Sequence, residues 1–256
     1  MTSSGEDIPP GFVSMHNGAV TPTPCIIRAA LPSDEPAWRQ LWRGYCDFYE
    51  VDVTDRASIE EAARSVEAEW GVPHLLLNNA GLDSPPDAPA EEVGPFEDYP
   101  EESFDAVMDV NVKGAFLCSQ AVGGAMARAG RGSIVNVSSV YGFLSPVQDL
   151  YAFRRARGET FVKPVAYAVS KAAILNLTRY LATYWAKNGV RVNTVTLAGV
   201  WNDQPQEFLD AFAARSPLGR MLDAGEALGA VVFLASDAAS YVTGSNVVVD
   251  GGWSAW

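Results

Sequence analysis

A tyrosine and a lysine four residues apart carry the clearest chemistry in this sequence. Tyr167 and Lys171 lie in a stretch whose apolar residues recur at helical spacing, so both side chains share one helix face. The charge of Lys171 is expected to lower the pKa of Tyr167 from its usual value of about 10. Tyr167 could then exchange a proton near neutral pH. Taken alone, the pair fits a solvent-exposed helix face better, so its meaning depends on the rest of the chain.

The composition argues against several other kinds of chemistry. The 256 residues carry a net charge of −13, which disfavours nucleic acid or an anionic membrane as a partner. Three widely spaced cysteines and two histidines give little material for a disulfide framework, a histidine triad or a metal site, and we expect no metal. We also expect no membrane-spanning stretch and no secretory signal. These features predict a soluble, cytoplasmic protein.

Strands alternate with helices after residue 50, which predicts an α/β fold with a mainly parallel sheet. Apolar and β-branched runs predict strands that end near residues 55 and 81 and strands over 133–139, 190–196 and 246–250. Helical patterns cover 58–70, 103–128, 166–188 and 224–235, and Gly189 is placed to end the third of them. Polar motifs follow several strands, at the sheet edge where α/β proteins bind ligands.

Seven short motifs follow one another over about 200 residues. They are Asp52-Val-Thr-Asp55, Asn78-Asn-Ala-Gly81, Asn111-Val-Lys-Gly114, Ser138-Ser139, Tyr167-x-x-x-Lys171, Arg191-Val-Asn193, and Thr243-Gly244 with Asp250-Gly-Gly252. Together they resemble the short-chain dehydrogenase/reductase family, and the tail from Tyr167 is most similar to its flagellin-modification branch. The resemblance implies a Rossmann-like, doubly wound sheet. It also implies an NAD(P)-dependent oxidoreductase whose small-molecule substrate is a polar alcohol or ketone. An acidic alcohol or ketone derived from a sugar is one possibility.

The resemblance assigns catalytic roles to four residues. Tyr167 would give or take the proton on the substrate oxygen, while Lys171 would lower its pKa and hold the nicotinamide ribose. Ser139 would hydrogen-bond the same substrate oxygen, and it fits better than Ser138 because it begins the family's Ser-x-x-Gly pattern. Asn111 would position a water that links Lys171 to solvent. A residue that merely kinks its helix is the alternative reading of Asn111.

The resemblance also implies a set of cofactor-binding residues. Asp52 would accept a hydrogen bond from the adenine amino group, and Asn78, Ala80 and Gly81 would line the cofactor cleft at a strand end. An ordinary strand-end turn is the alternative for residues 78–81. The complete set implied for NAD or NADP is Asp52, Val53, Asn79, Ala80, Gly81, Tyr167 and Lys171.

The front of the chain departs from the family pattern. No glycine-rich phosphate-binding turn precedes Asp52, so the first strand–helix unit is atypical or missing and weak cofactor binding is expected. Residues 1–24 are expected to form a disordered or loop lead. Residues 25–50 are expected to form an atypical strand–helix segment, in which 26–50 resembles the N-terminal fragment of a GNAT-type acetyltransferase. Residues 51–256 would form the dehydrogenase-like domain. A catalytically silent, chimeric remnant that binds or oligomerises is the alternative function.

The stretch between the Ser139 strand and the Tyr167 helix, residues 143–165, is predicted to be a substrate lid. Three arginines in it, Arg154, Arg155 and Arg157, suit an anionic sugar derivative, and three solvated arginines are the alternative.

Self-association into a homodimer or homotetramer is expected through the helices over 103–128 and 166–188. The candidate interface residues, which also fit an ordinary core, are Val107, Phe116, Leu117, Ala173, Leu177, Tyr180 and Tyr184.

Overall fold

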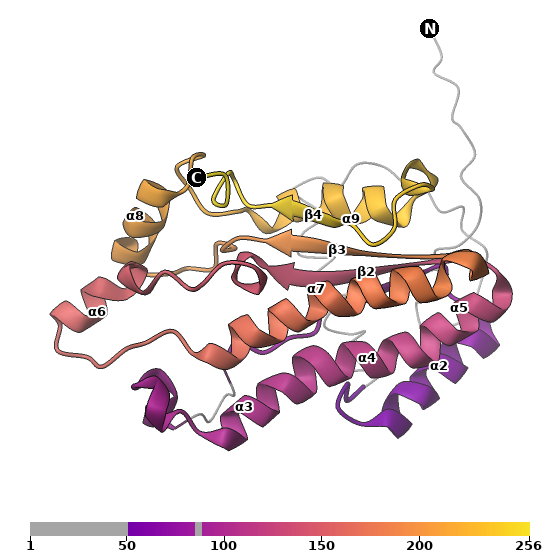
Figure 1. The fold of residues 1–256 in the computed structure, drawn as a ribbon, viewed down its shortest axis with the longest axis horizontal. Helices are drawn as coiled ribbons and strands as arrows, with labels where there is room; N and C mark the ends of the chain where they lie inside the picture. The colour runs from indigo at the N-terminus through magenta and orange to yellow at the C-terminus, as the bar shows by residue number, and fades with distance from the viewer. Residues whose placement is uncertain (1–50, 85–88) are drawn as a thin grey trace, which may run out of the picture. The chain divides into compact units, whose positions relative to one another are not determined.

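The computed structural model describes residues 51–84 and 89–256. The predictions for residues 1–50, including the acetyltransferase-like resemblance, lie outside the described residues. In the described part, a four-stranded sheet has the order β1-β2-β3-β4, and every neighbouring pair is parallel (Figure 1). The strands are β1 (Leu75–Asn78), β2 (Gly132–Ser139), β3 (Val190–Leu197) and β4 (Asn246–Val249). The predicted parallel α/β sheet is confirmed.

The helices fall close to their predicted positions. They are α2 (Arg56–Trp70), α3 (Glu101–Met108), α4 (Ala115–Cys118), α5 (Gly124–Ala129), α6 (Ala152–Ala156), α7 (Val165–Trp185), α8 (Gln206–Arg215) and α9 (Leu228–Ala235). Short 3-10 turns occupy Ala90–Val93, Phe96–Asp98, Val140–Gly142, Gln148–Tyr151, Ala186–Asn188, Ala224–Ala227 and Asp237–Ala239. Within the described ranges, none of these helices combines the length and apolar character needed to cross a membrane.

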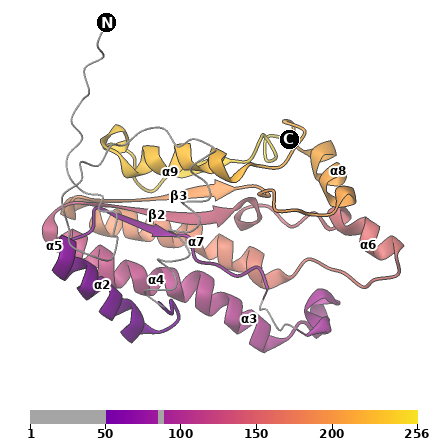
Figure 2. The same cartoon turned by 180° about the vertical axis from the view of Figure 1, so that it is seen from behind.

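Helices cover both faces of the sheet. Figure 1 shows α7 and the line of helices from α3 to α5 on one face and α9 on the other, and Figure 2 shows the same layers from behind. On the α7 face, Ile134 and Val192 pack with Trp185, and on the α9 face Val135 and Val195 pack with Leu234. Central parallel strands are buried on both faces, which explains their nearly continuous β-branched sequences. The predicted doubly wound arrangement is therefore present.

Residues 51–55, the described part of the chain before α2, form no strand, contrary to the prediction for this stretch. The Asp52 carboxylate instead accepts hydrogen bonds from the backbone N–H and the hydroxyl of Thr54, at 2.8 and 2.7 Å, which closes a local turn. Asp55 then caps α2, because its carboxylate accepts from the N–H groups of Ala57 and Ser58. Local side-chain bonding thus replaces the expected strand end.

The long helix predicted over 103–128 runs from Glu101 to Ala129 but is not uniformly α-helical. Two π-helical segments, Asp109–Gly114 and Ser119–Gly123, interrupt it. The first contains Asn111, so this side chain projects from a local irregularity. Such bulges are frequent at functional sites.

Gly189 ends the α7 region, as predicted. It follows the 3-10 turn Ala186–Asn188 and has a φ of 72°, in the left-handed region. A Cβ at this position would lie 2.1 Å from the carbonyl oxygen of Gly130, which ends α5. The two helix ends can approach this closely because residue 189 has no side chain.

Candidate active site

The structure brings Ser139, Tyr167 and Lys171 together at the carboxyl edge of the sheet. Ser139 ends β2 and caps the following 3-10 turn, where its hydroxyl accepts from the N–H of Tyr141 at 3.3 Å. Tyr167 and Lys171 lie in the first two turns of α7, with Lys171 Nζ 5.6 Å from the centroid of the Tyr167 ring. The Ser139 side chain is also a hydrogen-bond partner of the Tyr167 phenol. The 28-residue separation in sequence is thus closed in space.

Ser138 has a different place from Ser139. Its hydroxyl donates to the carbonyl oxygen of Lys171 at 2.8 Å and is buried. Gly142 fits tightly in the same place, since a Cβ there would lie 2.7 Å from both the Lys171 carbonyl and the Ser138 hydroxyl. The end of β2 is therefore joined to α7 through Ser138, while Ser139 faces Tyr167.

The expected lowering of the Tyr167 pKa is wrong for this structure. Burial raises the pKa of Tyr167, and hydrogen bonding to Ser139 offsets only part of that effect. Desolvation disfavours the phenolate, and the negative charge of Asp83 disfavours it further. At neutral pH the Tyr167 side chain is a neutral phenol that can donate a proton.

Lys171 is held in a buried position. Its Nζ donates to the carbonyl oxygen of Val137 at 3.1 Å, and the residue is 6% exposed. Burial lowers the pKa of Lys171 to about 8, and the negative charge of Asp83 opposes this shift. Lys171 is thus held next to the Tyr167 phenol, and the burial that holds it there also destabilises its charged form.

Asn111 joins the loop after β1 to α7. Its Nδ2 donates to the Leu82 carbonyl and the Ser170 hydroxyl, at 2.8 and 2.9 Å, and its Oδ1 accepts from the Leu82 N–H at 2.7 Å. Ser170 in turn donates to the Tyr167 carbonyl at 2.8 Å. All of these bonds are within the protein. This geometry makes Asn111 a positioning residue for the loop after β1 and for α7, and its water-binding role stays a prediction.

The residues implied for cofactor binding lie along the strand ends. Asn79, Ala80 and Gly81 are exposed, and the carboxylate of exposed Asp52 is occupied by Thr54. Val53 packs against the π-helical segment, where a Cβ on Gly114 would lie 3.1 Å from its side chain. Asn79, Ala80 and Gly81 are thus accessible to a ligand in the described part of the chain.

Asn78 differs from its neighbours because it points into the protein. Its Nδ2 donates to Asn136 Oδ1 at 2.8 Å and to the Ser119 hydroxyl at 3.2 Å. Asn136 donates onward to Thr178, which shares a hydrogen bond with Thr194. Asn78 is thus part of a polar network between the strands and α7, and its amide does not line a cleft.

The site has the features expected of the nicotinamide end of a cofactor cleft. A Cβ on Gly81 would lie 3.3 Å from both Asn111 Oδ1 and Lys171 Nζ, so the absence of a side chain here leaves space next to Lys171. The chemistry of a buried ammonium beside a phenol fits a ribose hydroxyl. A glycine-rich turn for the pyrophosphate is not found in residues 51–84 or 89–256. The described residues therefore fit one end of the cofactor only.

The arginines of the insertion are paired with groups of this chain. Arg154 contacts Glu159 at 2.6 Å and lies over the Phe161 ring, and Arg157 pairs with Glu207. Arg155 donates to the Gln148 carbonyl and contacts Asp149. Neighbouring carboxylates and a carbonyl contact all three guanidinium groups, so an anionic substrate would compete with groups of this chain, and the anion-binding role stays a prediction.

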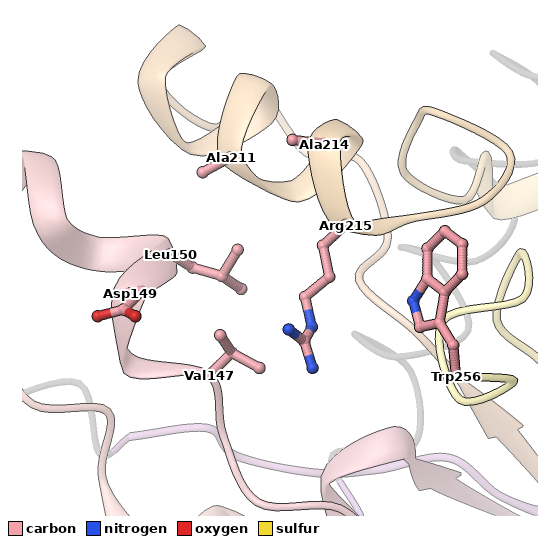
Figure 3. A pocket seen from close by; sticks show the side chains of 7 residues that line it. All are labelled: Val147, Asp149, Leu150, Ala211, Ala214, Arg215 and Trp256. Carbon is pink, nitrogen blue, oxygen red and sulfur yellow. The ribbon is translucent and has the colours of Figure 1, made fainter.

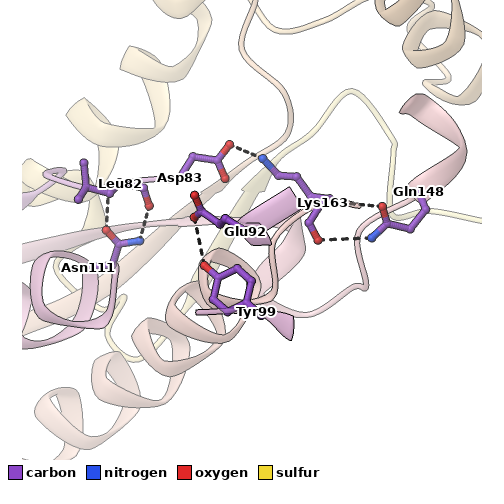
Figure 4. Close-up of polar contacts among 7 residues, drawn as sticks. All are labelled: Leu82, Asp83, Glu92, Tyr99, Asn111, Gln148 and Lys163. Carbon is purple, nitrogen blue, oxygen red and sulfur yellow. Dashed lines mark hydrogen bonds and ion pairs between the residues drawn. The ribbon is translucent and has the colours of Figure 1, made fainter. Parts of the chain in front are cut away.

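Sequence reasoning missed a polar contact that closes over Tyr167. Figure 4 shows Lys163, from the insertion, pointing to Asp83, from the loop after β1, and the two form an ion pair. Lys163 Nζ also lies 5.6 Å from the centroid of the Tyr167 ring. The two residues are 80 positions apart. The one signal in the sequence was the position of Lys163, four residues before Tyr167.

A separate cavity of about 450 Å³ lies between the insertion, α8 and the C-terminal residue (Figure 3). It is lined by Val147, Asp149, Leu150, Ala211, Ala214, Arg215 and Trp256. The Arg215 guanidinium lies 5.3 Å from the centroid of the Trp253 ring. None of the candidate catalytic residues lines this cavity, so the candidate active site is identified by its side chains and not by this cavity.

In the described part of the chain, no three His, Cys, Asp or Glu side chains gather as a metal site requires.

The fold and this site define an α/β protein in which a tyrosine, a lysine and a serine lie together at the carboxyl edge of a parallel sheet. A family model described as Enoyl-(Acyl carrier protein) reductase matches residues 33–254. D-threitol dehydrogenase of Mycolicibacterium smegmatis is 33% identical to this chain over 217 residues, which cover 83% of this chain and 75% of that protein.

Two solved structures show the same similarity. A short chain dehydrogenase from Leptospira borgpetersenii with bound NAD+ is 35% identical, with a TM-score of 0.69, over 79% of this chain and 73% of that chain. A gluconate 5-dehydrogenase from Burkholderia cenocepacia, in complex with NADP and tartrate, is 29% identical, with a TM-score of 0.67, over 80% of this chain and 74% of that chain. This chain belongs to the short-chain dehydrogenase/reductase family. The predicted family, fold and NAD(P)-dependent oxidoreductase class are confirmed.

Proposed function

We propose that this protein oxidises a secondary hydroxyl of a polyol or sugar-derived alcohol to a ketone, and catalyses the reverse reduction, with NAD or NADP. The observation that carries the proposal is the cluster of Ser139, Tyr167 and Lys171 at the carboxyl edge of the sheet. The names of the similar threitol and gluconate dehydrogenases support the substrate class.

In this mechanism the protein moves the proton. The Ser139 hydroxyl donates to the substrate oxygen, and the Tyr167 phenol donates its proton to the same oxygen when a ketone is reduced. The bound nicotinamide supplies or accepts the hydride. Because burial keeps the pKa of Tyr167 high, the neutral phenol is ready for reduction at neutral pH, whereas oxidation needs the phenolate and is favoured at higher pH.

Neutral polyols are the primary substrates in this proposal. The acidic sugar derivative is the alternative, but the three arginines that suggested it are engaged with groups of this chain. An acidic substrate remains the expectation of the flagellin-modification resemblance. Comparing the turnover of galactitol and galactonate separates the two.

We also propose that the protein works as a homodimer or homotetramer in the cytoplasm, with residues 51–256 as the catalytic domain. Phe116, Tyr180 and Tyr184 are 42%, 63% and 64% exposed, which suits an interface on the α4 and α7 side. Val107 and Leu117 are excluded from that interface because they are buried in the core, and Ala173 and Leu177 are partly buried.

The catalytically silent remnant is the second candidate function. One observation favours it: no glycine-rich phosphate-binding turn precedes Asp52 in the sequence. Such a protein would keep the fold and the polar cluster without holding a dinucleotide.

Turnover with threitol and galactitol, with each cofactor, tests the main proposal, and gluconate serves as the acidic comparison substrate. Replacing Tyr167 with Phe removes the proton donor, and kcat should then fall by about 10²- to 10⁴-fold. Added NADH should also change the fluorescence of the seven tryptophans of the sequence. No turnover together with an unchanged fluorescence would support the silent remnant, and near-normal turnover in Tyr167→Phe would remove Tyr167 from the mechanism.

A further inference from the structure

Lys163 places a second ammonium group beside the Tyr167 ring. Its Nζ lies 5.6 Å from the ring centroid, the same distance as Lys171 Nζ. Lys171 reaches the ring from within α7, whereas Lys163 belongs to the insertion and lies two residues before α7 begins. The Lys163 side chain is only 11% exposed. A positive charge is therefore held largely out of water at the entrance to the candidate catalytic centre.

The partner of Lys163 is a carboxylate that remains open to solvent. Asp83 follows Gly81 by two residues, pairs with Lys163 through Oδ2, and has a side chain that is 53% exposed. After burial, its negative charge is a further cause that raises the pKa of Tyr167 and of Tyr141. The Asp83 carboxylate is thus close enough to influence the charge state of Tyr167 and is still partly exposed to solvent.

The backbone around Lys163 is fixed by hydrogen bonds. Its N–H donates to Gln148 Oε1 at 2.8 Å, and Gln148 Nε2 donates back to its carbonyl oxygen at 3.5 Å (Figure 4). The neighbouring Val162 N–H donates to the Val93 carbonyl at 2.7 Å. These bonds limit where the Lys163 ammonium can go, as a binding site requires.

The ion pair has unused hydrogen-bonding capacity on both sides. An ammonium has three donors, and in the described part of the chain Lys163 Nζ uses one of them, on Asp83 Oδ2. Asp83 Oδ1 accepts from no described residue. An alcohol hydroxyl can donate to Asp83 and accept from Lys163 while the two charges stay paired. A substrate carboxylate, in contrast, could accept from Lys163 but could not donate to Asp83, whose charge would offset its attraction to the ammonium.

We propose that Asp83 and Lys163 form a hydroxyl-binding pair, which holds the substrate hydroxyl next to the one that reacts at Tyr167. The substrate class is then the neutral vicinal diol, and not the simple alcohol or the hydroxy acid. This inference rests on the proposed function, because it assumes that the reacting carbon lies at Tyr167. It assigns substrate selection to two residues that the family motifs of this sequence do not include.

The first test compares two substrates that differ by one hydroxyl, butane-2,3-diol and butan-2-ol. In Lys163→Met, kcat/KM for the diol should fall about 10- to 100-fold, the value of one charge-assisted hydrogen bond, with little change for butan-2-ol. Asp83 is half exposed, so its carboxylate returns to water and the variant should fold. Arg157→Met is the matched control, because it removes an ion pair from the same insertion at Glu207 and should affect neither substrate.

The second test measures binding without turnover. Saturation-transfer NMR with threitol, recorded with and without millimolar NAD+, should show contact with the wild type and with Arg157→Met. The signal should be lost in Lys163→Met and in Asp83→Asn. Threitol binding that both variants lose, in a wild type that shows no turnover, would contradict the proposed function but support hydroxyl binding by the pair. Absence of threitol binding in the wild type, or equal losses for both alcohols in Lys163→Met, would overturn the pair.

Discussion

Replacement of Asn111 by Ala tests whether the loop after β1 depends on one buried side chain. Asn111 is 2% exposed and makes three hydrogen bonds, two of them with the backbone of Leu82. The substitution leaves the Leu82 N–H and carbonyl without protein partners. Because Leu82 is partly exposed, each group should cost about 1–2 kcal/mol, giving about 2–4 kcal/mol in all. That is a large part of the about 5–15 kcal/mol that stabilises a typical domain.

Urea unfolding measures the global effect, and hydrogen exchange at residues 79–84 measures the local one. Ser170→Ala is the control, because it removes one bond to Asn111 and leaves both Leu82 bonds intact. It should cost only about 1 kcal/mol and should not change exchange at the Leu82 amide. If Asn111→Ala kept wild-type stability and wild-type exchange at Leu82, Asn111 would not be what holds the loop after β1 to α7. A loss of activity in that variant would then point to the water-binding role.

The other predictions concern the cofactor, pH and assembly. Without the glycine-rich turn, the loss of two or three charge-assisted bonds of roughly 1.5–3 kcal/mol each should leave NAD(H) and NADP(H) binding no tighter than millimolar, and a low-micromolar Kd by calorimetry would contradict this. Burial lowers the pKa of Lys171 from 10.5 to about 8, so the folded state binds fewer protons than the unfolded state between those values. The unfolding free energy of the wild type should therefore rise relative to that of Lys171→Met between pH 8 and 10.5, by up to roughly 3 kcal/mol. A difference between the two proteins that does not change with pH would argue against the lowered pKa of Lys171. Tyr180→Glu with Tyr184→Glu should convert a dimer or tetramer to monomer in light scattering, and a wild-type monomer would refute the association.

Most of the fold could be predicted because its strands and helices carry strong local patterns. The β-branched runs ending at Ser139 and Leu197 could only be buried parallel strands, and Gly189 marked the end of the α7 region. The π-helical segment at Asn111 was not predictable, since it depends on bonds to Leu82 and Ser170 and leaves the apolar spacing nearly unchanged.

The site was predicted in part for the same reason. Ser139, Tyr167 and Lys171 were found through their sequence pattern, but the raised pKa of Tyr167 follows from burial, which the pattern does not contain. The contact between Asp83 and Lys163 joins two loops, and the position of Lys163 four residues before Tyr167 does not reveal its partner. The arginines of the insertion were assigned to an anion because the sequence does not show which carboxylates fold back onto them.

The bond from Ser138 to the Lys171 carbonyl, with Gly142 packed against the same turn of α7, makes this region suited to loop exchange. The exposed tip of the insertion, residues 156–160, could therefore be replaced by loops of other lengths while Ser139 and Tyr167 keep their relative positions. A library built at this tip would vary substrate choice without rebuilding the proton-transfer centre. In this architecture the strands and helices hold the catalytic residues in place, and substrate specificity can be changed through the one loop that connects β2 to α7.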